Sequence, residues 1–256
     1  MNLSPTLRQH MKRWLRPLRT TAGRFVIPVE TRESTILHKA AEITSSEHIE
    51  GDYIEFGVFR GSTLIQAYHT IRESYLRRSA DRTRIHQPEY RDRVRELWDG
   101  MRFFGFDSFQ GLPPLSGFDV QTRDFAAGKF RCGQEECLRN LRKHGVDLAK
   151  VILLAGWFAD TCRDETIRRY RMKSAAIVHI DCDLYESTRT VLGFIRPLLV
   201  DGTVLVFDDW YSFRGNPALG EQRAFHEWRE TVEGFVFVEY QKEGPWRNSF
   251  IASRRL

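Results

Sequence analysis

The alternation of apolar and polar stretches along the chain predicts strands and helices that follow one another in turn. Ala175–Ile180 and Thr203–Phe207 are short apolar runs rich in β-branched residues, which is typical of strands buried on both faces of a parallel sheet. Between them, residues 186–199 have the apolar spacing of a helix, and Asp201 and Gly202 are expected to form the turn into the second strand. This segment therefore predicts a βαβ crossover. The side chains expected on the buried side of its helix are Leu184, Thr188, Val191, Leu192 and Ile195.

The same patterns predict the rest of an α/β domain. An amphipathic helix is expected within residues 31–49, and another from Ser62 to about Leu76. The whole chain then predicts a mostly parallel seven-stranded sheet with N-terminal helices and a C-terminal antiparallel hairpin at the sheet edge. The remaining expected elements are the strands Tyr53–Phe56, Arg102–Phe106 and Val151–Leu154, the helices Gln134–His144 and Gly220–Val232, and the hairpin strands Phe235–Tyr240 and Asn248–Ala252.

The composition indicates one folded domain with a basic extension. Of the 256 residues, 41% are hydrophobic, which is enough for one sizeable core. We therefore expect a single domain over residues 31–256, preceded by a basic N-terminal arm over residues 1–30. The formal net charge is +5. Solvated helix faces are the simplest interpretation of this excess, although a basic surface also suits nucleic acid, an anionic membrane or a phosphorylated substrate. The excess is concentrated in Arg8–Arg24, Arg72–Arg95 and Arg139–Lys143.

The chain carries no sign of export or membrane insertion. Its four cysteines lack CxxC spacing, no run is long enough to span a bilayer, and the N-terminus has no apolar signal-peptide core. We therefore expect a cytoplasmic protein. Apolar residues in the arm recur at helical spacing, which suits docking on a second subunit in a homo-oligomer or, as an alternative, weak contact with a membrane surface. These residues are Leu3, Leu7, Met11, Trp14 and Leu18.

Carboxylates follow both strands of the βαβ unit. Asp181 and Asp183 come after the first strand, and Asp208 and Asp209 after the second. A right-handed crossover brings these strand ends to the same edge of the sheet, where open α/β sheets bind ligands. Four carboxylates there repel one another unless a cation or a proton-transfer role offsets the repulsion. Because all the ligands are oxygens, the sequence predicts Mg²⁺; the alternative is that some of these residues only cap helices or complete turns.

A second candidate site lies at the ends of the earlier strands. In the ExGxxxG pattern that starts at Glu55, Gly57 and Gly61 let the backbone approach a ligand, and Ser62 begins a helix whose free N–H groups suit negative charge. Asp107 ends the next strand, where an acid is placed to accept hydrogen bonds from ribose hydroxyls. Strand–glycine–helix turns also occur without a ligand, so this pattern indicates a binding site only in combination with the acid Asp107 at the end of the next strand.

Three further segments have features that predict a structural or functional role. Residues 108–131 contain Pro113-Pro114 and no periodicity, which predicts a lid loop with Phe125, Lys129 and Phe130 available to close over a substrate. Residues 77–100 form an arginine-rich, partly helical insert, expected to be a structural elaboration or an interface. Trp157 and Phe158 follow a strand and either wall off a planar base or belong to the core.

Five sequence blocks resemble the TylF/MycF/NovP family of S-adenosylmethionine-dependent and Mg²⁺-dependent O-methyltransferases, which act on deoxysugar hydroxyls. The blocks occur in the family order over residues 32 to 240. The resemblance implies a Rossmann-like class I methyltransferase fold. The blocks are IEFGVFRGST at 54–63, FDSFQGLP at 106–113, GWFADT at 156–161, IDCDLYEST at 180–188 and FDDW at 207–210.

The resemblance also implies a role for each matched position. Asp181, Asp208 and Asp209 correspond to the metal-binding aspartates, and Asp183 to the general base; Asp181 also counts among the catalytic and cofactor-binding residues. The other positions that the resemblance assigns to S-adenosylmethionine are Glu55, Gly57, Gly61, Ser62, Asp107, Ser108, Gly156 and Trp157.

These roles agree with the chemistry of the reaction. A sugar hydroxyl is a weak acid, so its methylation requires a Lewis acid on the oxygen and a carboxylate that takes the proton. We therefore expect a Mg²⁺-dependent O-methyltransferase acting on a sugar, a glycosylated natural product or a polysaccharide precursor. The arginine surplus is available for a nucleotide-diphosphate or lipid-phosphate group on that acceptor.

Two other functions remain open at this point. The Asp181-Cys182-Asp183 triplet is also a DxD, the metal–diphosphate motif of glycosyltransferases, although such an enzyme does not need the ExGxxxG turn or Asp107. A non-catalytic binding protein with this fold, docking through its basic arm, is the other alternative. It would not need four carboxylates in one crevice.

Overall fold

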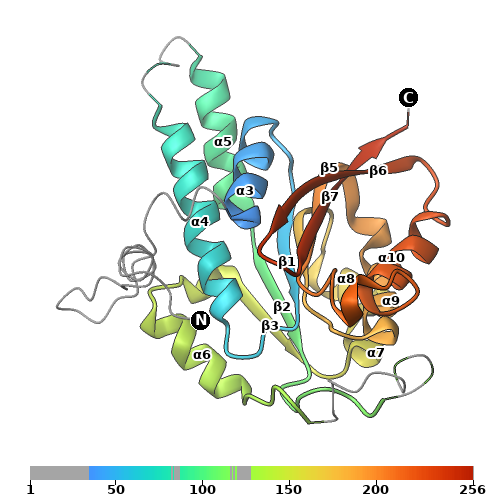
Figure 1. Cartoon of the computed structure of the whole chain (residues 1–256). Coiled ribbons are helices and arrows are strands. Elements are labelled where there is room, and N and C mark those ends of the chain that lie inside the picture. Colours follow the sequence, from blue (N-terminus) through green and yellow to red (C-terminus); the bar gives the residue numbers. More distant parts are fainter. Residues whose placement is uncertain are drawn as a thin grey trace, which may run out of the picture. The chain divides into compact units, whose positions relative to one another are not determined.

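The computed structural model describes residues 35–81, 83, 87–115, 117, 119 and 128–255. The predicted basic arm over residues 1–30 lies outside them, as does Phe125 of the predicted lid loop. The cartoon in Figure 1 labels the helices and strands of the described part.

One seven-stranded sheet forms the centre of the described residues, with strand order β3-β2-β1-β4-β5-β7-β6. The first five strands pair in parallel, and β7 runs antiparallel to both of its neighbours. This confirms the predicted mostly parallel sheet and its closing hairpin. The strands are β1 (Asp52–Phe56), β2 (Phe103–Asp107), β3 (Val151–Ala155), β4 (Ala175–Ile180), β5 (Leu199–Phe207), β6 (Phe235–Glu243) and β7 (Arg247–Arg254).

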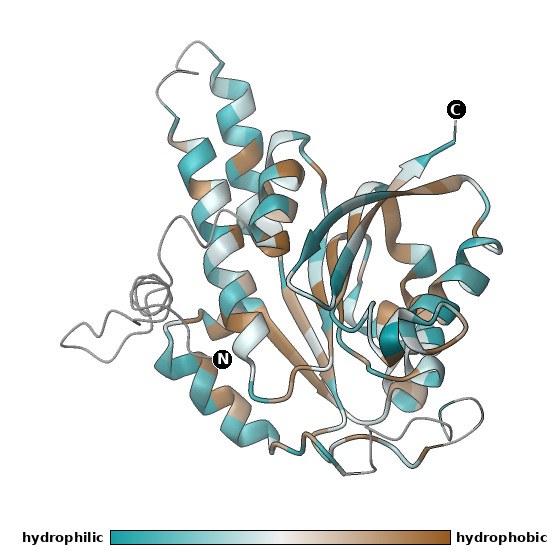
Figure 2. Cartoon of the chain, in the orientation of Figure 1, coloured by the Kyte–Doolittle hydropathy of each residue, from teal (hydrophilic) through white to brown (hydrophobic). Residues whose placement is uncertain are grey.

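Helices cover both faces of the sheet because the central strands are apolar on both sides. Figure 1 shows α3, α4 and α5 grouped on one side, and α8, α9 and α10 on the other. Figure 2 shows hydrophobic residues concentrated along the central strands, whereas the helices carry both classes. The helices are α3 (Ile36–Ser46), α4 (Ser62–Ser79), α5 (Pro88–Gly100), α6 (Gln134–Lys143), α7 (Phe158–Thr161), α8 (Asp164–Tyr170), α9 (Tyr185–Ile195) and α10 (Gly220–Arg229).

The central βαβ unit differs from its prediction in one respect. All five side chains predicted on the buried side of α9 are buried. The helix, however, ends at Ile195, shortly before Pro197, and β5 already begins at Leu199, so the expected turn at Asp201 and Gly202 lies within this strand. The pairing register with β4 shifts there, which leaves a bulge in β5.

The bulge is held by side-chain hydrogen bonds that periodicity does not reveal. Thr203 Oγ1 accepts from the Val200 amide at 2.9 Å and donates to the Ala175 carbonyl at 2.7 Å. Asp201 Oδ1 accepts from the amide of Arg254 at 2.9 Å. The strand is therefore longer than its apolar run.

The insert at residues 77–100 contributes to the core. Its first residues extend α4 to Ser79, and its second part forms α5. Val94, Leu97 and Trp98 of α5 are buried in the core on the α4 side of the sheet. The short helix α8 was not expected, because it has no buried residue and therefore no apolar periodicity.

Candidate active site

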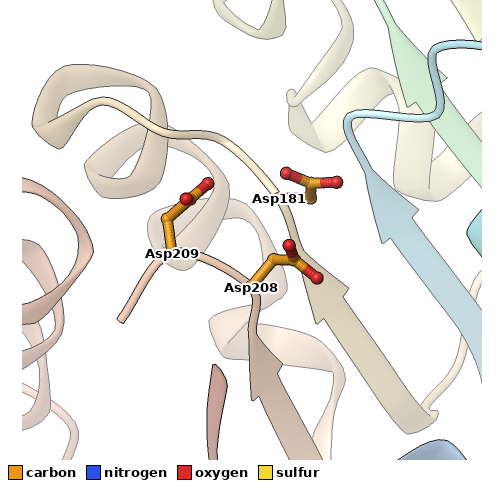
Figure 3. A group of neighbouring side chains, drawn as sticks. All are labelled: Asp181, Asp208 and Asp209. Atoms are coloured by element: carbon orange, nitrogen blue, oxygen red, sulfur yellow. The ribbon is translucent and has the colours of Figure 1, made fainter. Parts of the chain in front are cut away.

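Three aspartate carboxylates meet where β4 and β5 end. Asp181 follows β4, and Asp208 and Asp209 follow β5, which is the direct neighbour of β4. Each offers one oxygen, and the three oxygens lie within 4.8 Å of one another (Figure 3). Oxygens on opposite sides of one Mg²⁺ lie about 4.2 Å apart, since each bond is about 2.1 Å. The three residues therefore fit a divalent cation after a small contraction.

The partners of these aspartates leave oxygens for a cation. Asp208 Oδ1 accepts from Arg247 Nε at 2.5 Å and lies 3.5 Å from His179 Nε2, and Asp209 Oδ1 accepts from Ser212 Oγ at 2.9 Å. Asp208 Oδ2 has no such partner among these bonds, so Asp208 can serve as a ligand through this atom. Asp209 also has a side-chain hydrogen bond with Asp183.

Burial and the neighbouring charges shift the pKa values of the carboxyl groups in the cluster. Burial, followed by the charges of Asp208 and Asp183, raises the pKa of Asp181 well above its usual range. Burial also acts to raise the pKa of Asp208, but the hydrogen bond from His179 and the Arg247 cation together lower it. The cluster is thus partly neutralised by Arg247, and a metal ion would add to this neutralisation.

Asp183 lies beside the cluster without being one of its three residues. It adopts a φ of 59°, in the left-handed region that non-glycine residues seldom occupy. Burial, and then the charge of Asp209 and a hydrogen bond to it, raises the pKa of Asp183 to about 8. A carboxyl group with this pKa is suited to taking a proton near neutral pH.

The turn after β1 approaches the same edge. Gly57 has a φ of 89°, and a Cβ atom at this position would collide with the carbonyl oxygen of Asp181. Its amide donates to the carbonyl of Phe106 at 2.9 Å. A glycine is therefore required here because the ends of β1 and β4 lie so close together.

Substitution of Gly57 by alanine is expected to lower the free energy of unfolding by about 2–4 kcal/mol, through steric overlap and an unfavourable φ. Gly193 provides the control, because it is exposed within α9 and nothing lies within 4 Å of an added Cβ. Gly193→Ala should stabilise the protein by about 0.5–1 kcal/mol. Thermal melting of both variants measures the difference, and an unchanged melting temperature for Gly57→Ala would contradict the close approach.

Asp107 is held with its carboxylate at the cavity. Its Oδ2 accepts from the Phe59 amide at 2.7 Å, and its Oδ1 from the Phe109 amide at 2.6 Å. Each oxygen retains a lone pair for a ligand. The Asp107 carbonyl also accepts from the Gly156 amide at 3.0 Å, which ties the β2 and β3 ends together, and Ser108 Oγ donates to the Gly111 carbonyl at 2.8 Å.

Some of the predicted cofactor residues do not line the cavity. Glu55 is fully buried and accepts a hydrogen bond from the Tyr53 hydroxyl at 2.6 Å; burial raises its pKa to about 7. Gly61 has a φ of 81°, and an added Cβ would meet Cys137 Sγ of α6 at 3.1 Å, so the backbone conformation and this close contact both favour glycine here. Ser62 is an exposed first residue of α4, and Gly156 is not among the lining residues.

A cavity of about 730 Å³ joins the two predicted regions. Trp157 and Phe158 both line it, and Phe158 also packs edge to face on Phe56 of the core with ring centroids 5.8 Å apart. Contact of these two rings with a planar base stays a prediction. Eight lining residues are acidic, and among the described lining residues none is lysine or arginine. The acidic ones are Asp107, Asp119, Asp160, Asp181, Asp183, Glu186, Asp208 and Asp209.

The two ends of the predicted lid loop are joined to each other by backbone hydrogen bonds. Leu112 exchanges two backbone hydrogen bonds of 2.9 Å with Gly128 and Lys129. Phe130 lines the cavity with 53% of its surface exposed and contacts the ring of Phe59 edge to face, whereas Lys129 is not a lining residue. Asp119 accepts from the amides of Tyr185 and Glu186 at 2.8 and 3.1 Å, at the start of α9.

Several residues of the site were not predicted from the sequence, among them Phe59, Asp119, Arg247 and Glu221. Phe59 and Asp119 line the cavity, Arg247 binds Asp208, and Glu221 contacts both aspartate loops. The pairing of Phe207 with Asn248, continued by one residue, brings Arg247 opposite Asp208, so a known register would have revealed Arg247. An acid in the first turn of a helix is common, and nothing distinguished Glu221.

The chain is similar to characterised methyltransferases. The family model described as macrocin-O-methyltransferase (TylF) matches residues 92–234, more than half of the chain. Over 180 residues the chain is 27% identical to the 8-demethyl-8-(2,3-dimethoxy-alpha-L-rhamnosyl)-tetracenomycin-C 4'-O-methyltransferase of Streptomyces olivaceus and 28% identical to the demethyldecarbamoylnovobiocin O-methyltransferase of Streptomyces niveus. Each match covers 68% of this chain and 58% of the relative, so the chain matches little more than half the length of these relatives.

The fold is also that of a solved structure. The crystal structure of CalS11, a calicheamicin methyltransferase, superimposes with a TM-score of 0.63 and 20% sequence identity, over 98% of this chain and 94% of that one. At 20% sequence identity, this similarity shows a shared fold only. None of the described helices is long and apolar enough to cross a membrane.

Proposed function

Because the chain belongs to the macrocin-O-methyltransferase (TylF) family and has the class I methyltransferase fold, we propose that it transfers the methyl group of S-adenosylmethionine to a hydroxyl of a sugar or glycosylated natural product. The observation that carries this proposal is the single cavity that joins Asp107 and Trp157 to the aspartate cluster. A cofactor and an acceptor can meet in such a cavity at the carboxyl ends of the strands.

The cofactor end of the cavity is assigned to Asp107 and its surroundings. The free lone pairs of Asp107 accept hydrogen bonds from the ribose hydroxyls, and Trp157 and Phe158 cover the adenine. Gly57 allows the cofactor to approach the backbone of the β1 turn, since this residue has no side chain to obstruct it. Glu55, Gly61 and Ser62 act through the packing and position of this turn rather than by lining the cavity.

The acceptor end of the cavity is assigned to the aspartates. Asp181, Asp208 and Asp209 would hold Mg²⁺, which fits the all-oxygen donor set and the spacing of the three carboxylates. The ion would supply Lewis acidity to an acceptor hydroxyl and so lower its pKa. Asp183 takes the hydroxyl proton on its carboxylate. Phe59 and Phe130 exclude water and help hold the acceptor in line with the methyl group.

The charge of the cavity favours an acceptor without phosphate. The eight lining carboxylates, with no lysine or arginine among the described lining residues, would repel a diphosphate group in the absence of a cation. A nucleotide-diphosphate or lipid-phosphate group could therefore enter only if the divalent cation offset this repulsion. The described lining residues supply no arginine for such a group. The partner, in this proposal, is an uncharged glycoside.

Calorimetry with S-adenosylhomocysteine tests the proposed function. We expect one binding site per chain for this product, and no binding of a nucleotide sugar in the presence of Mg²⁺. A screen with labelled methyl donor against uncharged glycosides and nucleotide sugars then identifies the acceptor class. Binding of nucleotide sugars without binding of S-adenosylhomocysteine would reverse the proposal in favour of a glycosyltransferase. Homo-oligomerisation and a cytoplasmic location stay predictions.

A further inference from the structure

A buried glutamate links the two loops that carry the aspartates. Glu221 lies in the first turn of α10 and is 1% exposed. Its Oε1 accepts from the amide of Cys182 at 3.4 Å, and its Oε2 accepts from the amide of Asp209 at 3.0 Å. Each oxygen of this one carboxylate therefore contacts a different loop.

The two amides that Glu221 contacts belong to the cluster itself. Cys182 lies between Asp181 and Asp183, and Asp209 follows Asp208 directly. The hydrogen bonds to Glu221 therefore restrain the backbone of both ligand-bearing segments relative to each other. A one-residue shift of either segment would break its bond.

Burial of the Glu221 carboxyl group costs free energy, which its role in restraining the two segments would explain. A buried carboxylate close to Asp181, Asp208 and Asp209 loses hydration and is repelled, and both of its hydrogen-bond partners are backbone amides rather than cations. The next residue strengthens the same link, because Gln222 Nε2 donates to the carbonyl of Trp210 at 2.6 Å. The start of α10 thus contacts two consecutive residues that follow β5, Asp209 and Trp210, and one residue that follows β4.

We propose that Glu221 is a positioning residue that holds the Asp181–Asp183 and Asp208–Asp209 segments at the separation at which one divalent cation contacts both. This inference rests on the metal site of the proposed function. Glu221 does not bind the ion; it fixes the spacing of the residues that do. A residue of this kind is comparable to the outer-shell partners of other metal sites, which orient the ligands.

Two variants separate positioning from charge. Glu221→Asp keeps the carboxyl group but is one methylene shorter, so it cannot reach both amides. Glu221→Gln keeps the length but can accept through only one of its two terminal atoms. Glu230→Gln is the control, because it removes the same charge just after α10 from a side chain that is 74% exposed.

Binding of Mn²⁺ to the protein saturated with S-adenosylhomocysteine provides the readout, through the loss of the electron paramagnetic resonance signal of the free ion. We expect both Glu221 variants to bind Mn²⁺ about 10- to 100-fold more weakly, as with other outer-shell changes. Affinity for S-adenosylhomocysteine should stay within about twofold in both, and Glu230→Gln should match the wild type.

The outcomes distinguish the inference from the function. Wild-type affinity for Mn²⁺ in Glu221→Asp would overturn the inference and leave charge as the only role of Glu221. Loss of both S-adenosylhomocysteine binding and the thermal transition in both variants would show a structural role and also overturn it. A wild-type protein that binds S-adenosylhomocysteine but no Mn²⁺ contradicts the metal site, whereas failure to bind S-adenosylhomocysteine contradicts the proposed function itself.

Discussion

Replacement of Asp181 by alanine is expected to abolish binding of the divalent cation and to reduce methyl transfer by roughly 100- to 1,000-fold. The loss corresponds to about 3–4 kcal/mol of transition-state stabilisation, the scale of metal Lewis acidity. Asp181 contributes one of the three clustered oxygens and lies between β4 and the cavity. Its removal also relieves repulsion with Asp208, so we expect the variant to be folded and at least as stable as the metal-free parent protein.

Mn²⁺ titration, turnover and thermal melting of Asp181→Ala test this result together. Asp164→Ala is the matched control, because Asp164 is an exposed aspartate in the first turn of α8, away from the cluster. Addition of a chelator to the parent protein should reproduce the loss of turnover. Full activity in chelator would contradict metal dependence, and it would require another source of acidity for the acceptor hydroxyl.

Replacement of Asp183 by asparagine should lower kcat by about 10²- to 10⁴-fold, the usual contribution of a general base. Asparagine preserves the shape of the side chain but cannot take a proton, so affinities for cofactor and metal should change little. Measurement of kcat and of both affinities separates these effects. If the variant keeps its rate, the proton acceptor lies elsewhere; His179 and His226 are the other titratable candidates, although neither lines the cavity.

The pH dependence of the parent enzyme supplies a second measurement of the role of Asp183. The pKa of Asp183 is raised to about 8 without metal, and a bound cation would lower it. The rate should therefore rise with pH and level off below about pH 8.

The stability of the metal-free protein should also depend on pH through Asp183. In the metal-free protein the folded state keeps a proton on Asp183 that the unfolded chain releases above about pH 4. Stability should therefore fall as pH rises from about 4 to about 8, and Asp183→Asn should weaken this fall.

The aspartate cluster was largely predictable from the sequence. Two apolar runs, each followed by carboxylates, were sufficient to bring Asp181, Asp208 and Asp209 to one edge, because a parallel crossover has a fixed hand. The clustering does not depend on where β5 begins, so the error over the turn at Asp201 and Gly202 had no effect on the site.

Other parts of the site depend on contacts between distant segments. Arg247 reaches Asp208 only through the pairing of β7 with β5, and Glu221 reaches the aspartate loops only through the packing of α10. Neither contact leaves a periodic pattern in the chain. Glu55 and Gly61 match a cofactor motif but are not lining residues of the cavity, so their assignment to the cofactor stays a prediction.

The position of β7 constrains the order in which the protein can be completed during synthesis. This strand lies between β5 and β6 but follows both in the chain, so β6 cannot join the sheet until β7 has left the ribosome. Arg247, the cation that binds Asp208, arrives with the same strand. Until then the aspartate cluster lacks its nearest protein counter-charge, and a nascent chain that stops before β7 would hold the aspartates without being able to assemble the finished site.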